Sequence, residues 1–466
     1  MAPLVTSNSR KNGHDSSLPR YDIFCRTISH ERRRPIMDTR STVPLSNLMD
    51  IKHGYAFSSR YFTKTPTEYI LLTPGNFSKE RGLSFGSNTT YYEGPVSEEF
   101  ILNDGDLLIV MTDLRKNMAI LGRTAILHRD GSNKRILHNQ RIGKVTPKAG
   151  RADPEYLMHL LNSPAARKEI KATATGTTVR HTSPGKILDV EAWAPAIPEQ
   201  KKIADLLSRW DRLIESTGRL MDACRERRRA LAQGLLSGRL RFPEFVRATA
   251  VRKRSETAPY SLPCPIDWDY PCIGEIAHPV SKRNKDADAA SEPLPILSCT
   301  KDRGLVDSAR HFGGKTLARD RSSYKIVRRG QFAYATNHLE EGSLGYQDRY
   351  EKALISPMYT IFETSGQIVD EFLYLVLKTE RYRHAFAVNT NASVNRRGRI
   401  RWQEFARIKV PMPPMAEQRG IVRAFSAIDR EIELLHEQKT ALDRQKEALM
   451  GKLLTGRWRI PMFGPN

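Results

Sequence analysis

The sequence has little of what secreted, membrane-spanning or zinc-binding proteins need. No run approaches about 18 apolar residues, so no membrane-spanning helix is expected. Cysteines are few, odd in number and irregularly spaced, which predicts a reducing compartment and no disulfide framework. No Cys-x-x-Cys or His-x-x-x-His pair is present, so no metal site is predicted. The five cysteines among the 466 residues are Cys25, Cys224, Cys264, Cys272 and Cys299.

Negative charge is also scarce. The chain holds 75 Lys and Arg against 52 Asp and Glu, which gives a formal net charge of +23 and a pI of about 9.9. A basic excess of this size favours a polyanionic partner, most simply nucleic acid. A merely solubilising basic surface is the alternative that charge alone leaves open.

No complete catalytic or cofactor motif occurs in the sequence. Gly314-Lys315-Thr316 resembles the end of a phosphate-binding loop, but Ala309 stands where that loop requires glycine. The segment that begins with Asp153-Pro154 misses the tetrapeptide of amino-methyltransferases. We therefore predict that the chain catalyses no reaction itself and holds no cofactor.

One eight-residue stretch occurs twice. The chain reads LLSGRLRF at residues 235–242 and LLTGRWRI at 453–460, 218 positions later. A Glu-Gln pair recurs at the same offset, as Glu199-Gln200 and Glu417-Gln418. A repeat that keeps its spacing over about 45 residues predicts a duplicated unit and a pseudo-two-fold molecule, not a solenoid, whose period would be shorter.

A long amphipathic segment follows each Glu-Gln pair. In the second copy a strict seven-residue column is formed by Ile421, Ile428, Leu435, Leu442 and Leu449, in a remainder rich in charge. This period predicts two coiled-coil helices, each of about 37 residues and about 55 Å. Each apolar stripe must be buried, and under pseudo-two-fold symmetry the two helices are expected to pair antiparallel.

The segments before each helix mix short apolar runs with Gly, Pro and helical stretches. The expected fold class is α+β, with two mixed α/β domains joined by two long antiparallel coiled-coil helices. The predicted organisation is a flexible basic tail at 1–40 without a signal peptide, a first globular domain at 41–197, a spacer helix at 198–240, a linker at 241–261, a second globular domain at 262–413, a spacer helix at 414–460 and a C-terminal tail at 461–466.

Six loops combine basic, amide and hydroxyl side chains. Arg can read guanine, Asn can read adenine, and Lys and hydroxyl groups can hold phosphates. For any single residue, a solvated loop charge is the alternative. The predicted DNA-contacting residues are Asn76, Lys79, Arg115, Lys116, Thr177, Thr178 and Arg180 in the first domain, and Lys301, Arg303, Asn337, Asn395, Arg396, Arg397 and Arg399 in the second.

The first helix also carries four clustered arginines, at 225 and 227–229. They could form a solvated face, contact DNA phosphates or contact a partner subunit, and the sequence does not separate these alternatives.

Together these features resemble the specificity subunits of type I restriction–modification systems. The resemblance rests on the doubled Glu-Gln entry into a long helix that ends in Leu-Leu-Ser/Thr-Gly. It extends to IKHGYAF at 51–57, Gly176-Thr177-Thr178 and the segment 265–268, and covers residues 41–460. The second half departs from the pattern, since Asn391-Ala392-Ser393 stands where a Gly-Thr-Thr form would be expected.

The resemblance implies a DNA-recognition subunit in the cytoplasm of a bacterium or archaeon. Its two target recognition domains would each read half of a split, asymmetric target, and its helices would set the gap. Two methyltransferase subunits would dock on the helices and methylate adenine, joined in some systems by two restriction subunits. S-adenosylmethionine, ATP and Mg would belong to these partners. Residues expected at the contact with the partner helix are Glu199, Gln200, Ile203, Glu417, Gln418, Ile421, Ile428 and Leu435.

Two other functions compete with this interpretation. An RNA- or single-strand-binding protein would explain the charge, but such proteins stack bases on aromatic side chains, which make up only 8% of this chain. A basic coiled-coil scaffold whose globular domains bind protein would explain the helices but would show no DNA sequence preference.

Overall fold

The computed structural model describes residues 42–460 apart from 79–81, 116, 129–130, 132, 247–250, 253–263, 285–293, 313–320 and 390–399. By internal contacts the chain divides into unit 1, Met1–Ser208 with Glu447–Asn466, and unit 2, Arg209–Lys446. The two expected tails and most of the expected linker lie outside the described residues.

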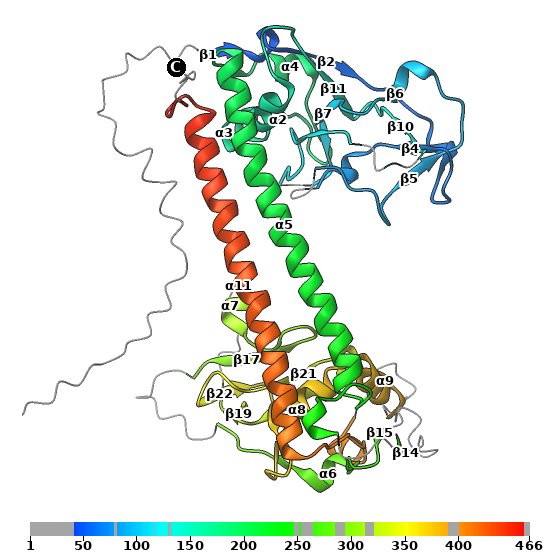
Figure 1. Ribbon diagram of the computed structural model, residues 1–466, viewed down its shortest axis with the longest axis vertical. Coiled ribbons are helices and arrows are strands. Elements are labelled where there is room, and N and C mark those ends of the chain that lie inside the picture. Colours follow the sequence, from blue (N-terminus) through cyan, green and yellow to red (C-terminus); the bar gives the residue numbers. More distant parts are fainter. Residues whose placement is uncertain are drawn as a thin grey trace, which may run out of the picture. The chain divides into compact units, whose positions relative to one another are not determined.

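Unit 1 combines two main sheets with short helices (Figure 1). Its strands are β1 Thr42–Pro44, β2 Met49–His53, β3 Phe62–Thr63, β4 Tyr69–Leu71, β5 Thr90–Tyr92, β6 Ile101–Leu102, β7 Leu107–Val110, β8 Thr112–Asp113, β9 Thr124–Ile126, β10 Arg135–Leu137, β11 Ile142–Pro147, β12 Arg180–His181 and β13 Glu191–Trp193. Its helices are α2 Pro154–Asn162, α3 Pro164–Ala172, α4 Pro184–Leu188 and the start of α5 Ile197–Leu235, with short 3-10 turns at Leu45–Asn47, Ser59–Tyr61, Pro74–Asn76 and Glu98–Phe100.

Unit 2 is built from a similar set of elements. Its strands are β14 Val251–Arg252, β15 Cys264–Pro265, β16 Ala277–Val280, β17 Ile296–Thr300, β18 Gly304–Asp307, β19 Lys325–Arg328, β20 Phe332–Ala335, β21 Leu344–Tyr346, β22 Lys352–Ile355 and β23 Tyr359–Thr364. Its helices are α6 Ile273–Ile276, α7 Ser308–Phe312, α8 Asp370–Leu377, α9 Glu380–Asn389, α10 Trp402–Ala406 and most of α11 Met415–Leu453, with 3-10 turns at Pro243–Phe245 and Leu339–Glu341.

The two units share one sheet topology, apart from the additional edge strand β3 of unit 1. In unit 1 the sheets run β2-β11-β7-β9 and β3-β5-β4-β10-β6; in unit 2 they run β16-β23-β20-β21 and β18-β17-β22-β19. In both units the second sheet has one parallel pair, β4 with β10 and β17 with β22, between antiparallel neighbours. Although their sequences barely match, the globular parts therefore have the same fold.

Strand β7 lies between two hydrophobic cores of unit 1. Its four residues, Leu-Leu-Ile-Val, are all buried, as expected for a strand covered on both faces. Leu107 and Ile109 join a core with α2 and α3, while Leu108 and Val110 join the core between the two sheets. This alternation follows from the two-residue period of a strand.

Helix starts follow local signals that the sequence carries. Asp153 caps α2 by accepting the backbone N–H of Tyr156, and Pro154 stands at the first helical position. Ser163 caps α3 in the same way. The helical stretches expected before the long helices are confirmed, with α2 at Pro154–Asn162 in unit 1 and α8 at Asp370–Leu377 in unit 2.

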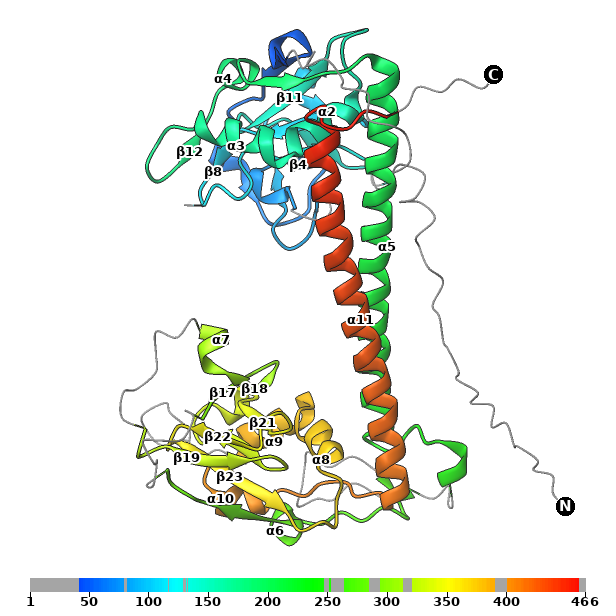
Figure 2. The same ribbon diagram turned by 90° about the vertical axis from the view of Figure 1, so that its left-hand side faces the viewer.

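The long helices α5 and α11 each have 39 residues and lie side by side within each unit (Figures 1 and 2). In unit 2, Cys224 lies opposite Glu431 and Asp211 opposite Lys446, so the helices are antiparallel there. In unit 1, Leu207 near the start of α5 shares a core with Leu453 at the end of α11. The α+β class with two long paired helices, predicted from the sequence, is confirmed.

Candidate nucleic-acid interface and helix-end clamps

Two of the predicted DNA-contacting loops of unit 1 meet at one hollow. The loop after β4 and the loop after β8 border it, and its volume is about 270 Å³. Leu114 extends from the second loop with 66% of its surface exposed, beside the exposed Arg115. The hollow is lined by Thr73, Pro74, Gly75, Thr112, Asp113, Leu114, Arg115, Ile120 and Arg141.

The third predicted loop of unit 1 joins the other two through a short ribbon. Strand β12 pairs antiparallel with β8, which sets Arg180 opposite Asp113. Thr177 and Thr178 are exposed in the turn before β12, and Arg180 is half-buried. Three segments that are far apart in the sequence therefore form one surface.

A buried carboxylate fixes the central loop of this surface. Asp113 is 1% exposed, and its carboxylate accepts the backbone N–H groups of Arg115 at 2.9 Å and Ile120 at 2.7 Å. From α3, Arg167 donates to the carbonyl of Leu121 at 3.1 Å. Burial lowers the pKa of Arg167 to about 10, which leaves it charged at neutral pH. The loop thus has a rigid base beneath its exposed side chains.

One predicted contact residue has a different role. Asn76 is 1% exposed; its Oδ1 accepts the N–H of Thr73 at 2.8 Å and its Nδ2 donates to the carbonyl of Ser84 at 3.2 Å. Because its side chain is buried and its amide is hydrogen-bonded within the loop, Asn76 stabilises the loop and does not reach its outer surface. Lys79 and Lys116 lie outside the described residues.

A buried histidine supports the neighbouring turn between β10 and β11. His138 is 3% exposed, and its Nε2 lies 2.9 Å from the carbonyl oxygen of Ile142. Burial lowers the pKa of His138 to about 4, so the imidazole is neutral at pH 7 and can donate one N–H to that carbonyl.

Acid is expected to destabilise unit 1 through this histidine. In the unfolded chain His138 takes up a proton near pH 6.5, whereas in the folded chain it does so near pH 4. Its contribution is complete above pH 6.5 and is lost as the pH falls toward 4, by up to about 3 kcal/mol. Urea unfolding at pH 7 and pH 5 tests this: His138→Gln, which cannot titrate, should lose less stability than the native chain. Equal losses would contradict the assignment.

In unit 2, two predicted loops are tied together by one lysine. Lys301 and Arg303 are exposed in the turn between β17 and β18, and half-buried Asn337 follows β20. Nζ of Lys378, at the end of α8, donates to the carbonyls of Lys301 at 2.6 Å and Gly342 at 3.0 Å. Burial lowers the pKa of Lys378. Its three hydrogen bonds to carbonyl oxygens compensate for the burial of the amino group.

Ile400, the first described residue after the third predicted segment of unit 2, lies beside this loop. Asn389 ends α9, and the N–H of Ile400 donates to the carbonyl of Thr336 at 3.1 Å. The predicted contacts Asn395, Arg396, Arg397 and Arg399 themselves lie outside the described residues.

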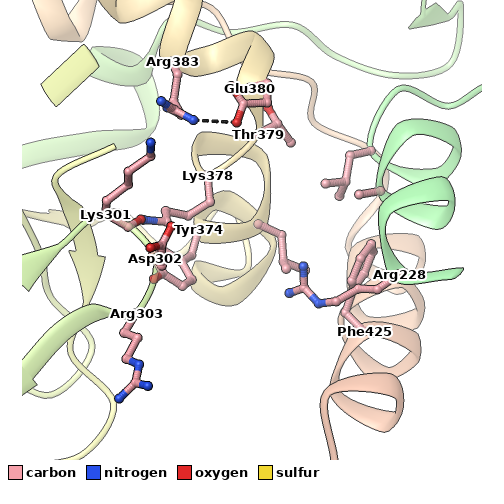
Figure 3. A pocket seen from close by; sticks show the side chains of 13 residues that line it. Arg228, Lys301, Asp302, Arg303, Tyr374, Lys378, Thr379, Glu380, Arg383 and Phe425 are labelled. Atoms are coloured by element: carbon pink, nitrogen blue, oxygen red, sulfur yellow. Dashed lines mark hydrogen bonds and ion pairs between the residues drawn. The ribbon is translucent and has the colours of Figure 1, made fainter. Parts of the chain in front are cut away.

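The turn with Lys301 and Arg303 borders a cavity of about 360 Å³ within unit 2. Figure 3 shows this turn on one side and Arg228 with Phe425, from the two long helices, on the other. Most of its cations already have anionic partners or carbonyls, and Glu380 pairs with Arg383 at 2.5 Å. The lining consists of Arg228, Ala232, Leu236, Lys301, Asp302, Arg303, Tyr374, Leu375, Lys378, Thr379, Glu380, Arg383 and Phe425.

The arginine cluster on α5 has a role that the sequence did not indicate. Two of its pairs join α5 to α11, and the one at Arg228 is bidentate, at 2.5 and 3.0 Å. In the second copy of the repeat, Lys446 pairs with Asp211 at the corresponding positions. Arg229 is exposed. The ion pairs of the cluster are Arg225 with Asp222, Arg227 with Glu431 and Arg228 with Asp429.

In unit 2 the arginine of the repeated motif holds the start of α11 through a buried network of ion pairs. Arg241 binds Glu417 in the first turn of α11 through two bonds of 2.8 Å, and Asp267 through bonds of 2.9 and 3.0 Å. The indole N–H of Trp268 donates to Glu417 at 3.0 Å. The side chains of Arg241 and Glu417 are 6% and 1% exposed, and the hydrogen bond with Glu417 raises the pKa of Arg241. We call this set the Arg241 clamp.

The second copy of the motif forms the equivalent contact in unit 1. Arg459 binds Glu199, in the first turn of α5, at 2.8 and 2.7 Å, and lies 5.4 Å from the ring centre of Trp193. Arg459 and Glu199 stand at the repeat positions of Arg241 and Glu417. This Arg459 clamp is more open, since the side chain of Arg459 is 49% exposed.

The glycine of the motif is required at both clamps. Gly238 and Gly456 have φ of +71° and +70°, the left-handed conformation in which glycine ends helices. A Cβ on Gly238 would lie 2.3 Å from Pro265, and one on Gly456 would lie 2.8 Å from Trp193. Each motif therefore turns the chain sharply onto a globular domain.

The glutamine beside each clamp ties a long helix to its globular domain. Oε1 of Gln200 accepts the N–H of Asp153 before α2 at 2.9 Å, and Oε1 of Gln418 accepts that of Val369 before α8 at 2.7 Å. Each Nε2 also donates to a proline carbonyl five residues upstream, at 2.8 and 2.7 Å.

The predicted helix-contact residues thus divide by role. Ile203, Ile421 and Ile428 are buried, and Leu435 is half-buried. Ile203 and Ile421 share their cores with the end of the opposite helix. The four Glu and Gln residues contact the segment after the opposite helix or a globular domain, all at 3% exposure or less.

The loop after β20 holds a small cluster of potential metal ligands. Within the part of the chain that the structure describes, one group of three potential metal ligands occurs, His338, Glu340 and Glu341, on the loop after β20. His338 and Glu341 are exposed and already hydrogen-bond each other at 3.0 Å. No helix in the described ranges is both long and apolar enough to span a bilayer.

Comparison with known proteins gives a consistent result. The family model for the type I restriction modification DNA specificity domain matches residues 37–223 and 305–444. The chain is 21% identical over 378 residues to the type I restriction enzyme MjaVIII specificity subunit of Methanocaldococcus jannaschii, covering 78% of this chain and 81% of that one. It is 23% identical over 365 residues to the putative MjaX specificity subunit of the same organism, covering 73% and 76%.

A solved structure has the same fold. The type I restriction–modification S subunit from M. genitalium superposes with a TM-score of 0.50 at 16% identity, over 89% of this chain and 96% of that one. Because the family model matches more than half of the sequence, the chain belongs to the type I restriction–modification DNA specificity family.

Proposed function

We propose that this chain is the subunit that selects the DNA sequence on which a type I restriction–modification complex acts. It has no catalytic role itself, and catalysis resides in other subunits. Unit 1 and unit 2 would each read one half of a split, asymmetric target through the loops described above.

The observation that carries the proposal is the pair of equivalent loop clusters. Apart from the additional strand β3, both units have the same sheet topology, and in both the described parts of the loops predicted to contact DNA lie together at the ends of corresponding strands. The side chains on these loops differ between the units, with Arg115 and Arg180 in one and Lys301 and Arg303 in the other. Two units that share a fold but present different side chains are suited to binding two different half-sites.

The helices α5 and α11 support the remaining part of the proposal. They connect the two units and are held to each by a clamp and a glutamine. We propose that their length sets the gap between the half-sites and that two methyltransferase subunits dock on them. S-adenosylmethionine would then be bound by those subunits, and ATP and Mg by restriction subunits where these exist.

A methylation map tests the proposal. The chain is co-expressed with the methyltransferase subunit encoded beside it, and modified adenines are mapped across the host DNA. We expect marks confined to one split, asymmetric motif, and their loss when this chain is omitted. Methylation that does not depend on this chain would contradict the proposal, and its absence would favour an RNA-binding or scaffold role.

Salt dependence separates these alternatives in vitro. A duplex reader should keep its preference for the mapped motif while its affinity falls steeply with salt. A single-strand binder should prefer the unpaired strands, and a protein scaffold should show no sequence preference.

A further inference from the structure

An equivalent turn occurs in both units at a place that the sequence did not indicate. In unit 1 it joins β10 to β11, and in unit 2 it joins β22 to β23, the corresponding strands. In unit 1 Oδ1 of Asn139 accepts the N–H of Arg141 at 3.1 Å; in unit 2 Oγ of Ser356 lies 3.5 Å from the N–H of Met358. A short polar side chain thus closes the turn onto the residue two positions later in both units.

Each turn lies against a loop already assigned to the interface. In unit 1 the N–H of Met111, just before β8, donates to the carbonyl of Arg141 at 3.0 Å. In unit 2 Oγ1 of Thr336, just before Asn337, donates to the carbonyl of Met358 at 3.2 Å. The turn is therefore a neighbour of the same loop in both units.

The turns are also held rigidly from beneath. In unit 1 the buried His138 and Asn139, 3% and 7% exposed, flank the base of the turn. In unit 2 Nζ of Lys325 donates to the carbonyl of Tyr359 at 2.6 Å, and the phenol oxygen of Tyr359 accepts the N–H of Cys299 at 3.2 Å. A fixed base allows a side chain at the tip to be placed accurately on a ligand.

The tip side chains themselves are exposed and chemically different. Arg141 is exposed and lines the hollow with Leu114 and Arg115. Met358 occupies the corresponding place in unit 2 with 55% of its surface exposed. One turn geometry thus presents a forked cation in unit 1 and an apolar thioether in unit 2.

We infer that this turn supplies a specificity-determining side chain in each unit, with Arg141 reading a guanine and Met358 contacting the methyl group of a thymine. The inference rests on the proposed function and adds two residues to it. A guanidinium matches O6 and N7 of guanine in the major groove, whereas an apolar side chain there discriminates through the thymine methyl. Because the turns belong to different units, the two bases should lie in different half-sites.

The test is a methylation map of the complete complex carrying Arg141→Ala or Met358→Ala. With Arg141→Ala we expect one guanine position of one half-site to become degenerate. With Met358→Ala we expect the same of one thymine position in the other half-site. On synthetic duplexes, 7-deazaguanine or deoxyuridine at these positions should weaken binding of the native complex by roughly 5- to 150-fold, and the matching variant should no longer respond.

Matched controls exclude general effects. Arg151→Ala removes an exposed arginine beyond the other end of β11, and Ile266→Ala removes an apolar side chain that is 53% exposed elsewhere in unit 2. Both should leave the motif unchanged. Since Arg141 and Met358 are exposed, thermal unfolding of their variants should match that of the native complex.

Three results would overturn the inference. An unchanged motif in both variants would show that the turns do not read bases. A uniform loss of methylation at all sites without a change of motif would mean that Arg141 contacts a phosphate. If both variants made positions of the same half-site degenerate, the assignment of the two turns to separate half-sites would be contradicted. Failure of the proposed function would look different, because the native complex itself would then give no motif that depends on this chain.

Discussion

Arg241→Ala is expected to destabilise unit 2 by about 3–5 kcal/mol, because it leaves the buried carboxylate of Glu417 without its cation. Asp267 and Trp268 would lose partners with it. Urea unfolding monitored by tryptophan fluorescence measures the change, because Trp268 lies inside the clamp and is fully buried.

Arg459→Ala is the matched comparison, since it removes the corresponding residue of the other clamp. We expect a smaller loss, about 1–2 kcal/mol, because Arg459 is half-exposed and water can reach Glu199 once the side chain is gone. Glu417→Gln should fall between the two, since it keeps hydrogen-bonding atoms but not the charge. Equal effects of the two arginine variants would contradict the difference in burial as the cause.

Lengthening both long helices by seven residues is expected to move methylation to sites with a longer gap. The insertions go between Gly218 and Arg219 in α5 and between Gln438 and Lys439 in α11, because Gly218 faces Lys439. Seven residues keep the apolar stripe in phase and add about 10 Å, or up to about three base pairs at 3.4 Å each. The half-site sequences should not change.

The control for this experiment is the same insertion in α11 alone. It would displace Lys446 from Asp211 while the shorter helix still ties the units together, so we expect unfolding or the original gap. A double variant that remains active on the original gap would show that the helices do not set it.

The arginine and the glutamate of the two clamps occupy equivalent positions of the repeat, whereas the tryptophans beside them come from different segments. Trp193 belongs to β13, which pairs with β1, whereas Trp268 precedes Asp269, which forms an isolated antiparallel bridge with Met412 in the segment before α11. The first indole therefore comes from the segment that leads into a long helix, and the second comes next to the segment that pairs with it. Both lie within 6 Å of the clamp arginine, at 5.4 and 5.7 Å. In both clamps an indole ring thus lies near the arginine, and either segment can supply it.

The helices, the strands and the duplication could be predicted from local patterns in the sequence. The seven-residue period gave the two long helices, and short apolar runs gave strands such as β7 and β20, because both periods are written along the chain. The constant offset of 218 positions predicted the equivalent placement of Glu199 and Glu417. The family followed from the same doubled motif.

The assignment of individual side chains depended on tertiary structure. Sequence showed Asn76 as a polar loop residue, but folding buries it, while Arg141 and Met358 carried no motif and came to the loop surface. The arginine cluster of α5 gave no sign of the partners of Arg227 and Arg228, which stand about 200 positions later on α11. Which loops converge is set by the parallel pairing of β4 with β10 and of β17 with β22. Such pairings join residues far apart in the chain, and no local period records them, so only the folded structure could decide them.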